Sequence, residues 1–477
     1  MGKKREKTKK SRESCIQIHN IDDEFETEVF PNGEEPNEKV SGTISPNQET
    51  DDEYFETPAV EEDEKKCVIE MTRRKEKALI EFRCRVEDAI LGNYLLRKPR
   101  NNGNVVPLSP KESANEIEQL KEITLWGVPI MPSKRHEGTD IVLAKFLRAK
   151  DYKVHEALEM LRNTLKWRKE FKADEILDEN LGPDIEKLAY INSIDKEGRP
   201  LYYQIYGAFK DRQMCRKIVS SQENCEMFIR RRVQYMEKSI KELKFESGGV
   251  NSIVQIIDLK NSQGPVTKEL RSLYRKSWML FQNHYPELIH RTIVINVPLW
   301  YYVSHVLSSR LKNQRRNSML STLRKLVFAR PGKAPETLLK FISPENLPVE
   351  YGGLQRENDP EFSPDDKASE LRVRANTSDR IQIPAPEVGV TIIWDLTVVG
   401  CEVGYKEEFV PDDEGSYNVL LQKDKEKKAG ESFRNSFYIS EPGKIVITID
   451  NYMLKRKKVL YRYKTRPTVP MYVFLKK

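Results

Sequence analysis

One stretch of the chain holds the residues best suited to binding chemistry. Residues 282–298 read Q-N-H-Y-P-E-L-I-H-R-T-I-V-I-N-V-P. Because Pro286 cannot donate a backbone hydrogen bond, it ends a helix at Tyr285 and leaves Glu287 as an acidic residue at the junction. The β-branched run at residues 292–297 predicts a short strand that is covered on both faces. The pattern therefore places a carboxylate just ahead of a buried strand.

An aromatic segment follows this strand. After Pro298 the chain reads L-W-Y-Y-V-S-H-V-L. Three aromatic residues in a row are unusual in an ordinary core helix and suit a movable apolar lid that meets a membrane interface. Ordinary core packing is the alternative interpretation. The lid residues that we expect are Leu299, Trp300, Tyr301 and Tyr302.

No catalytic motif accompanies these residues. The sequence contains no G-x-S-x-G nucleophile elbow, no G-x-x-x-x-G-K-[ST] phosphate loop and no H-E-x-x-H zinc motif. His284, His290 and His305 lie in or near the stretch, but none has metal-ligand spacing with a cysteine or carboxylate. We expect these histidines to be core or surface residues, and we expect a protein that binds no metal and is not an enzyme.

Composition indicates a protein that does not span a membrane. Of the 477 residues 32% are charged, the net charge is +7, and the mean hydropathy is -0.66. The longest apolar stretch, residues 293–307, is interrupted by polar residues and is shorter than the roughly 20 residues that a membrane helix needs. The basic N-terminus has no apolar region behind it, and the six cysteines form no C-x-x-C pair. We expect free thiols and a cytoplasmic location with peripheral membrane association.

Residues 1–110 are expected to form an extension ahead of the folded body. Residues 22–64 are rich in Asp, Glu and Pro and have few apolar side chains, so they cannot offset the entropy lost on ordering. Within the extension, residues 65–97 suit a basic helix. Either it lies on an anionic membrane, or it is a solvated helix that packs loosely on the body. We expect the ordered region to start near Lys111.

The ordered region begins with helices and continues with alternating strands and helices. Amphipathic runs at residues 139–150 and 154–171 predict a helical subdomain over residues 111–181. In residues 182–354, two β-rich runs joined by K-E-G-R-P come first, and helices and strands then alternate. This alternation predicts an α/β domain with a largely parallel sheet.

The C-terminal part has a different pattern. Residues 355–371 include a linker rich in Pro, Asp and Glu, and residues 372–477 form the last domain. In K-I-V-I-T-I-D-N and V-L-Y-R-Y-K the side chains alternate with a period of two, as in half-buried strands. Such strands, spaced regularly between Gly and Pro turns, predict an antiparallel β-sandwich.

Taken in order, the motifs resemble those of a known family. The segments F-L-R-A-K-D-Y-K-V, D-K-E-G-R-P-L-Y, I-I-D-L-K, Y-P-E, I-N-V-P and N-L-P-V-E-Y-G-G-L resemble the landmarks of the CRAL-TRIO lipid-transfer family. The C-terminal segments I-W-D-L-T-V and E-P-G-K-I-V-I-T-I-D-N resemble those of a Golgi-dynamics (GOLD) domain. An acidic tail, a CRAL-TRIO domain and a GOLD domain in this order are similar to the patellins of plants.

The resemblance implies a head-group site. In the phosphatidylinositol-binding members of that family, the glutamate of Y-P-E and a lysine after the lid hold the inositol phosphate head group. These positions fall on Glu287 and Lys325, where a lysine can donate to a phosphate and a carboxylate can orient it and accept from hydroxyls. The alternatives are a junction carboxylate and a solvated lysine. The segment before Lys325 departs from the family in length and sequence, so Arg324 is the next candidate.

A second departure concerns other lipids. Members that also carry phosphatidylcholine have small hydroxyl residues on the strand before D-L-K, where this chain has Ile253 and Gln255. Donors for the phosphate of a choline lipid are therefore missing. The identity of a second ligand stays open.

The resemblance implies a phosphoinositide-binding lipid carrier that acts at membranes in trafficking, including cell-plate formation in cytokinesis. Its bound phospholipid would be phosphatidylinositol or a phosphoinositide, with no other cofactor. The alternative is an adaptor that senses phosphoinositide membranes and recruits protein partners through its GOLD domain without moving lipid. Two basic segments, residues 423–428 and 455–458, are expected as loops that dock on anionic membranes or are merely solvated turns. No nucleic-acid partner is expected.

Overall fold

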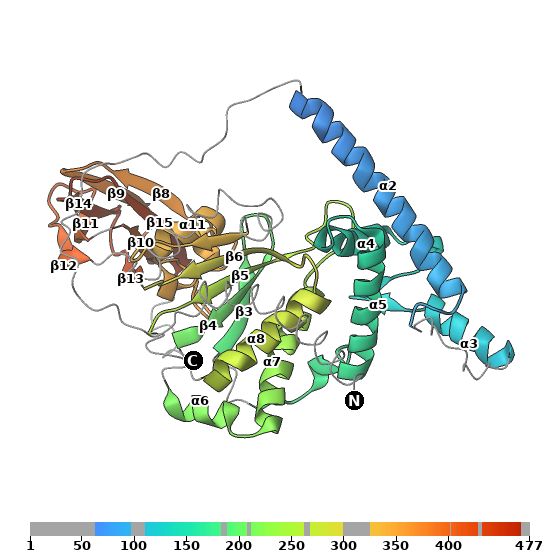
Figure 1. Cartoon of the computed structure of the whole chain (residues 1–477). Coiled ribbons are helices and arrows are strands. Elements are labelled where there is room, and N and C mark those ends of the chain that lie inside the picture. Colours follow the sequence, from blue (N-terminus) through green and yellow to red (C-terminus); the bar gives the residue numbers. More distant parts are fainter. Residues whose placement is uncertain are drawn as a thin grey trace, which may run out of the picture.

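The computed structural model describes residues 63–96, 110–182, 188–207, 211–261, 268–298, 325–400, 402–427 and 432–468. These residues form three parts that follow one another along the chain (Figure 1). A group of helices comes first, a five-stranded sheet with helices on both faces comes next, and a sandwich of two four-stranded sheets completes the described chain. The α/β domain and the C-terminal β-sandwich confirm the fold class predicted from the sequence.

Four helices and a short hairpin form the N-terminal part. Of the two amphipathic helices expected there, α5 has the predicted bounds and α4 starts and ends within two residues of them. The elements are α2 (Asp63–Leu91), α3 (Pro110–Lys121), β1 (Thr124–Leu125), β2 (Val128–Pro129), α4 (Glu137–Ala149) and α5 (Val154–Phe171).

Helix α2 contradicts the expectation that the ordered region starts near Lys111. Its side chains Phe82, Val86, Ala89 and Ile90 are fully buried in the core that they share with α4 and α5. They repeat at the spacing of one helix face, so a narrow apolar stripe runs between the many charged residues of this helix. The stripe faces the protein interior. Helix α2 is therefore neither loosely packed nor free to lay this apolar face on a membrane.

The central sheet has the strand order β3-β4-β5-β6-β7. Strands β3 and β4 form an antiparallel hairpin, and the other neighbours run parallel. Helices α7 and α8 pack on one face of the sheet, and α11 packs on the other (Figure 1). The bounds are β3 (Ala189–Ile194), β4 (Pro200–Ile205), α6 (Arg212–Val219), α7 (Gln222–Lys241), β5 (Ile253–Asp258), α8 (Lys268–His284), β6 (Ile289–Ile295), β7 (Leu326–Phe328) and α11 (Ala334–Phe341).

The two faces of this sheet differ in polarity. Residues that pair in register share a face, because side chains alternate along a strand. On the face toward α11, Tyr203, Ile256 and Ile293 pair and are fully buried. On the face toward α7 and α8, Tyr202 pairs with Gln255 and Gln255 pairs with Thr292. These last three residues form a row of polar groups across three strands, which we call the polar row.

The C-terminal sandwich has two antiparallel sheets, with the orders β13-β10-β15-β8 and β12-β11-β14-β9. Between them the buried indole of Trp394 donates to Glu407 Oε1 over 2.8 Å. The strands are β8 (Ser369–Val373), β9 (Thr377–Ala385), β10 (Val390–Val399), β11 (Val403–Pro411), β12 (Val419–Lys427), β13 (Ser432–Tyr438), β14 (Gly443–Asn451) and β15 (Lys457–Pro467).

One of the two expected basic loops is not a loop. Residues 423–427 lie within β12 and pair with β11, with a residue of each charge sign alternating along the strand. The expectation of a loop there was wrong because Lys and Asp were given more weight than the preceding V-L-L run. The second segment, residues 455–458, begins in the turn between β14 and β15 and continues into β15.

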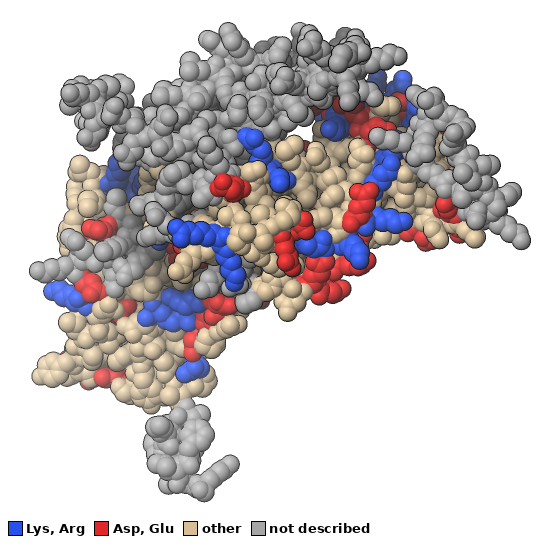
Figure 2. Space-filling model, turned by 60° about the horizontal axis from the view of Figure 1, so that its bottom comes forward, with Lys and Arg blue, Asp and Glu red and all other residues tan. Residues whose placement is uncertain are grey.

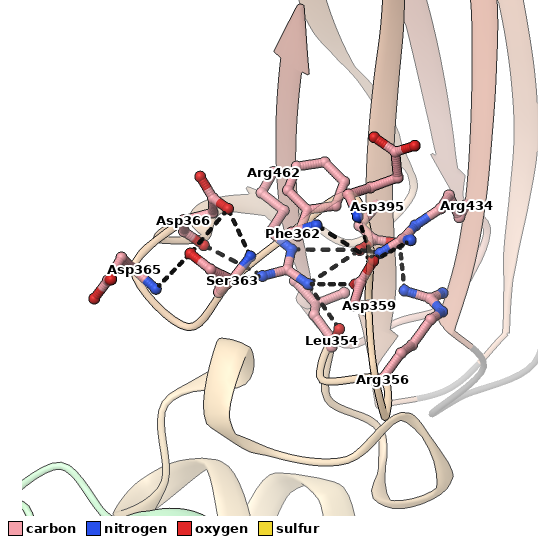
Figure 3. Close-up of polar contacts among 11 residues, drawn as sticks. Leu354, Arg356, Asp359, Phe362, Ser363, Asp365, Asp366, Asp395, Arg434 and Arg462 are labelled. Carbon is pink, nitrogen blue, oxygen red and sulfur yellow. Dashed lines mark hydrogen bonds and ion pairs between the residues drawn. The ribbon is translucent and has the colours of Figure 1, made fainter. Parts of the chain in front are cut away.

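A buried ion cluster joins the central domain to the sandwich (Figure 3). The carboxylate of Asp395, on β10, is fully buried and accepts from Arg356 Nη1 at 2.6 Å, from Arg434 Nη2 at 2.6 Å and from Arg462 Nη2 at 3.2 Å. Arg434 also donates to Asp359 Oδ1 over 2.7 Å. We call these five residues the clasp. They come from the linker and from three strands of one sheet, so the clasp holds the linker against the sandwich.

The clasp also reaches back to the end of the central domain. Arg462 Nη2 donates to the carbonyl of Leu354 over 2.8 Å, and the hydroxyl of Thr397 donates to the carbonyl of Gly352 over 3.1 Å. The ring of Phe362 lies 4.5 Å from the Arg462 guanidinium carbon and 5.0 Å from that of Arg434. Hydrogen bonds and cation–π contacts of this kind fix the junction more firmly than a bare linker would.

Candidate functional site

The two residues that the sequence singles out for head-group binding meet in the structure. Lys325 Nζ donates to Glu287 Oε2 over 2.6 Å. The lysine side chain is 32% exposed and the glutamate side chain 28%. An ammonium has three donors and a carboxylate has two acceptor oxygens, so both groups keep capacity for a further polar partner.

The fold brings them together because each residue precedes one of two neighbouring parallel strands. Glu287 comes two residues before β6, and Lys325 comes directly before β7. The backbone of Lys325 is already paired, since its carbonyl accepts from the amide of Thr292 over 2.8 Å. Parallel strands start at the same edge of a sheet, so the ion pair lies at the edge where these strands begin.

The backbone of Glu287 is held in an unusual conformation. Its φ of 54° lies in the left-handed region, which a glutamate rarely adopts without support from its surroundings. Helix α8 has just ended ahead of Pro286, and the next carbonyl, that of Leu288, already accepts from the amide of Ile253 over 2.8 Å. The chain therefore turns within two residues, and this turn aims the Glu287 carboxylate toward Lys325.

Lys145 of helix α4 holds this turn by a hydrogen bond to its backbone. Its side chain is only 2% exposed, and Nζ donates to the carbonyl of Glu287 over 3.0 Å and to Asn251 Oδ1 over 3.1 Å. Burial is the largest cause that lowers the pKa of Lys145 to about 7, and the positive charge of Arg148 acts in the same direction. A lysine of the helical subdomain thus holds the backbone of the residue that would face the head group.

Sequence reasoning missed Lys145, although a signal was present. The residue follows Val142 by three positions and precedes Phe146 by one, so it falls on the buried side of an amphipathic helix. A lysine there needs a polar partner inside the protein. That partner, the Glu287 carbonyl, lies 142 residues further along the chain and could not be named from the pattern.

The residues that distinguish a choline-lipid site are also placed. Ile253 is fully buried in the core, and Gln255 Oε1 accepts from the hydroxyl of Thr292 over 3.1 Å. The hydroxyl of Thr292, on the strand next to Lys325, is therefore already hydrogen-bonded to a side chain of the polar row. The other predicted residues, Leu299, Trp300, Tyr301, Tyr302 and Arg324, lie outside the described residues.

The histidine near the site is part of the core. His284, the last residue of α8, stacks on Trp167 with ring centroids 4.4 Å apart. Burial lowers the pKa of His284 to about 4, so the ring is neutral near pH 7. Across the described ranges, no group of His, Cys, Asp and Glu is arranged to hold a metal ion, and no helix is both long and apolar enough to cross a bilayer.

Two family models match the chain over the parts just described. The model of the CRAL/TRIO domain matches residues 186–353, which contain the ion pair and the polar row. The model of the Patellin-1-like, C-terminal GOLD domain matches residues 374–458 in the sandwich.

Several known proteins are similar to this chain over half of its length or more. Patellin-4 of Arabidopsis thaliana is 47% identical over 357 residues, which cover 74% of this chain and 64% of Patellin-4. A protein of Sclerotinia sclerotiorum named "Phosphatidylinositol transfer protein sfh5" is 30% identical over 257 residues, 50% of this chain and 58% of that protein. The crystal structure of Sfh5 aligns with 59% of this chain and 89% of its own, at 18% identity and a TM-score of 0.43.

One of these similarities extends over most of both chains. Patellin-3 of Arabidopsis thaliana is 39% identical over 378 residues, and the alignment covers 75% of each protein. The chain belongs to the patellin family.

Proposed function

We propose that the protein binds an inositol phospholipid at Glu287 and Lys325 and carries it between membranes without changing it chemically. The observation that carries this proposal is the 2.6 Å ion pair of two half-buried side chains at the edge where β6 and β7 begin. In this arrangement Lys325 donates to the phosphate, and the carboxylate accepts from inositol hydroxyls. The name of the sfh5 relative, a phosphatidylinositol transfer protein, supports the same ligand class.

The physical need for a carrier follows from the acyl chains. Each CH₂ group that enters water costs about 0.8 kcal/mol, so a diacyl lipid with about 30 of them leaves a bilayer very slowly without help. An apolar cavity removes that cost by replacing water around the chains. The head group then needs polar partners at the rim, which is the role that we give to the ion pair.

The first test replaces the phosphate donor. Lys325→Ala removes a charge-assisted hydrogen bond worth about 1.5–3 kcal/mol, so loading of phosphatidylinositol from vesicles should fall about 10-fold to 100-fold. The matched control is Lys333→Ala, because Lys333 forms a similar 2.7 Å ion pair with Glu336 at the start of α11, away from the site. Loading should fall only in the Lys325 variant.

The test can also correct the assignment. If Arg324→Ala abolishes loading while Lys325→Ala leaves it unchanged, the head-group donor is Arg324. If Lys325→Ala, Lys333→Ala and Arg324→Ala all load as the wild type does, the head group is not read at this edge and the proposed site is refuted. Thermal unfolding of each variant separates loss of binding from loss of folding.

A second candidate function, the adaptor that docks on membranes, rests on the turn between β14 and β15. In that turn Leu454 is 86% exposed, Tyr452 71% and Met453 43%. The basic residues Lys455 and Arg456 follow directly. We call these five residues the GOLD tip. Apolar side chains next to basic ones suit insertion into an anionic lipid surface.

The GOLD tip has a fixed shape. The buried side chain of Asn451 donates to the carbonyl of Arg374 over 2.8 Å and to that of Lys455 over 2.9 Å. The amide of Asn376 donates to the carbonyl of Met453 over 3.2 Å. Since the backbone is already held, the apolar side chains stay exposed at little further cost in entropy.

Local basic charge matters because charges of both signs are mixed on the face shown in Figure 2. On the face in Figure 2, lysine and arginine side chains of the described residues lie beside aspartate and glutamate side chains, so this part of the chain forms no broad basic field. An attraction of about 1 kcal/mol per basic residue near an anionic leaflet is therefore best supplied by a tip that approaches closely.

Flotation with vesicles of phosphatidylcholine and phosphatidylserine tests this candidate. The double variant Met453→Ser, Leu454→Ser should release the protein from the vesicles, whereas Val388→Ser should not. Val388 is also exposed, at 56%, but lies at the other end of the sandwich, beyond the pair Gly443 and Ala385. Equal flotation of both variants would show that the GOLD tip does not dock the protein on membranes. Unchanged lipid loading by the GOLD tip variant would show that membrane docking and lipid carriage are separate functions.

A further inference from the structure

Lys145 reaches from the helical subdomain to the proposed head-group site. Its side-chain nitrogen donates to the backbone carbonyl of Glu287 over 3.0 Å and to the side-chain oxygen of Asn251 over 3.1 Å. The lysine belongs to α4, whereas the two acceptors lie just ahead of β6 and β5. One buried nitrogen therefore joins two parts of the fold at the residue to which we assign the inositol hydroxyls.

The turn at Glu287 is the place where this link has its effect. The backbone of Glu287 has a φ of 54°, and a glutamate in this left-handed region costs free energy unless its surroundings stabilise the conformation. The bond from Lys145 to the carbonyl of the same residue supplies such support. The carboxylate then meets Lys325 at 2.6 Å. Loss of the Lys145 bond should let the turn relax and should misplace the carboxylate.

The hydrogen bonds of Lys145 suit an amine that can lose its proton. Within the described residues its nitrogen donates to two acceptors. A neutral amine has two N–H donors and is satisfied by these two acceptors, whereas an ammonium has a third donor. Only 2% of the residue is exposed, so the third donor has little access to water. The surroundings therefore accept the neutral form without an unpaired N–H group.

Three charged groups face this amine. They are Arg148 on the same helix, Glu287 on the turn and Lys325 ahead of β7. Burial is the largest cause that lowers the pKa of Lys145 to about 7, and Arg148 comes next; the charge of Glu287 opposes the decrease and that of Lys325 adds to it. The pKa of His284 is about 4, so this ring stays neutral between pH 6 and pH 8.5. Lys145 therefore changes its charge near neutral pH and interacts with both members of the ion pair.

We propose that Lys145 is a positioning residue of the head-group site, and that loading of an inositol phospholipid is coupled to the uptake of a proton by its amine. The proton comes from water and binds the lone pair of the nitrogen. Without it, the charges of Glu287 and Lys325 balance each other. The phosphodiester of phosphatidylinositol adds a negative charge, and a protonated Lys145 balances that charge. This inference rests on the proposed function and gives its site a dependence on pH.

The sign of the coupling follows from linkage. A negative head group favours the charged form of Lys145, so it raises the pKa above the value of about 7 in the lipid-free protein. Between these two pKa values the loaded protein binds more protons than the lipid-free protein, and loading therefore weakens as the pH rises. For a phosphate about 10 Å from the amine, at an effective dielectric constant of about 20, loading should fall about 10-fold across this window.

The experiment loads the full chain, freed of lipid, from phosphatidylcholine vesicles that contain labelled phosphatidylinositol. Loading is measured at pH 6, 7 and 8.5, where the phosphodiester of the lipid does not titrate and each variant is checked to be folded. Calorimetry with soluble dihexanoyl phosphatidylinositol, at pH 7 in two buffers with different heats of ionisation, gives the protons taken up per lipid. The wild type should take up a fraction of one proton and should load best at pH 6.

Two variants separate the roles of Lys145. Lys145→Met removes both the bond and the charge at similar volume, so it should load less at every pH, lose the pH dependence and take up no proton. Asn251→Asp keeps the lysine but places a carboxylate beside the amine. Lys145 then stays charged, and loading should be level from pH 6 to pH 8.5. This second variant keeps the test valid if Lys145→Met does not fold. Lys169→Met, at an exposed position of α5, is the control and should follow the wild type.

The outcomes distinguish this inference from the function on which it rests. A level wild-type profile without proton uptake would refute the inference, and so would a wild-type pH dependence in Lys145→Met or in Asn251→Asp. In each of these cases the proposed function stands if Lys325→Ala still loses phosphatidylinositol. If the wild type loads no phosphatidylinositol at any pH, the proposed function fails and this inference fails with it.

Discussion

Replacing Lys145 by methionine should change how the stability of the protein depends on pH. In the folded protein the pKa of this lysine is lowered from 10.5 to about 7, first because it is buried and second because Arg148 is near. Between these two values the unfolded chain binds more protons than the folded one. By linkage, the free energy of unfolding therefore rises with pH in this window. The stability gained at high pH is lost again as the pH falls to about 7.

The magnitude follows from the same two pKa values. The difference of about 3.5 units, 10.5 minus 7, corresponds to about 5 kcal/mol over the whole window at 1.36 kcal/mol per unit. Between pH 7 and pH 8.5 the wild type should therefore gain about 2 kcal/mol relative to Lys145→Met. The amine still donates to the Glu287 carbonyl when neutral, so the turn is kept over the whole range.

Urea unfolding at several pH values from 6 to 9 measures this difference. The probe should report on the helical part, because the chain has more than one domain and need not unfold in one step. Lys169→Met, at an exposed position of α5, serves as the control and should follow the wild type. Parallel curves for the wild type and Lys145→Met would show that the ammonium is not desolvated, which would refute the reasoning about the turn below Glu287.

Three other predictions follow from the fold and the site. Deleting residues 1–62 should leave the thermal transition nearly unchanged, whereas deletion through residue 96 should lower it by many degrees, because it removes Phe82 and Ile90 from the core. Asp395→Asn should lower the free energy of unfolding of the sandwich by about 3–5 kcal/mol in urea, because it removes the buried charge that Arg356, Arg434 and Arg462 share, while the exposed Asp365→Asn should have little effect. Vesicles with phosphatidylinositol or its phosphorylated forms should bind the protein in flotation more strongly than pure phosphatidylcholine, and equal binding would contradict the head-group assignment.

The sequence was sufficient where a short-range pattern dictates the structure. The helix at residues 154–171 has its apolar residues in a regular stripe, and the alternation around Ile445, Ile447 and Ile449 places those side chains in the core of the sandwich. The ion pair of Glu287 and Lys325 could be anticipated only from the resemblance to a family, because 38 residues separate the two along the chain.

The sequence was insufficient where a contact depends on distant partners. The apolar stripe of α2 is narrow and is surrounded by charge, so its burial becomes visible only beside α4 and α5. Lys145 and Arg232 read as ordinary basic residues of helices until the carbonyl of Glu287 and the side chain of Gln204 appear next to them. Residues 423–427 were mistaken for part of a loop because their charged residues are not typical of a strand, and pairing with β11 decides their structure.

The clasp also has a consequence for the order in which the protein is made. Asp395 is synthesised 39 residues before Arg434 and 67 residues before Arg462. While the chain emerges from the ribosome, the central domain can fold first, and Asp395 has only Arg356 as a partner until Arg434 and Arg462 have been made. A chain that terminates before β15 would lack the bonds of Arg462 to Asp395 and to the Leu354 carbonyl, and of the contacts named for this junction it would keep only those of Arg356, Arg434 and Thr397. The attachment of the sandwich to the central domain therefore gains its Arg462 bonds only after β15 has been made.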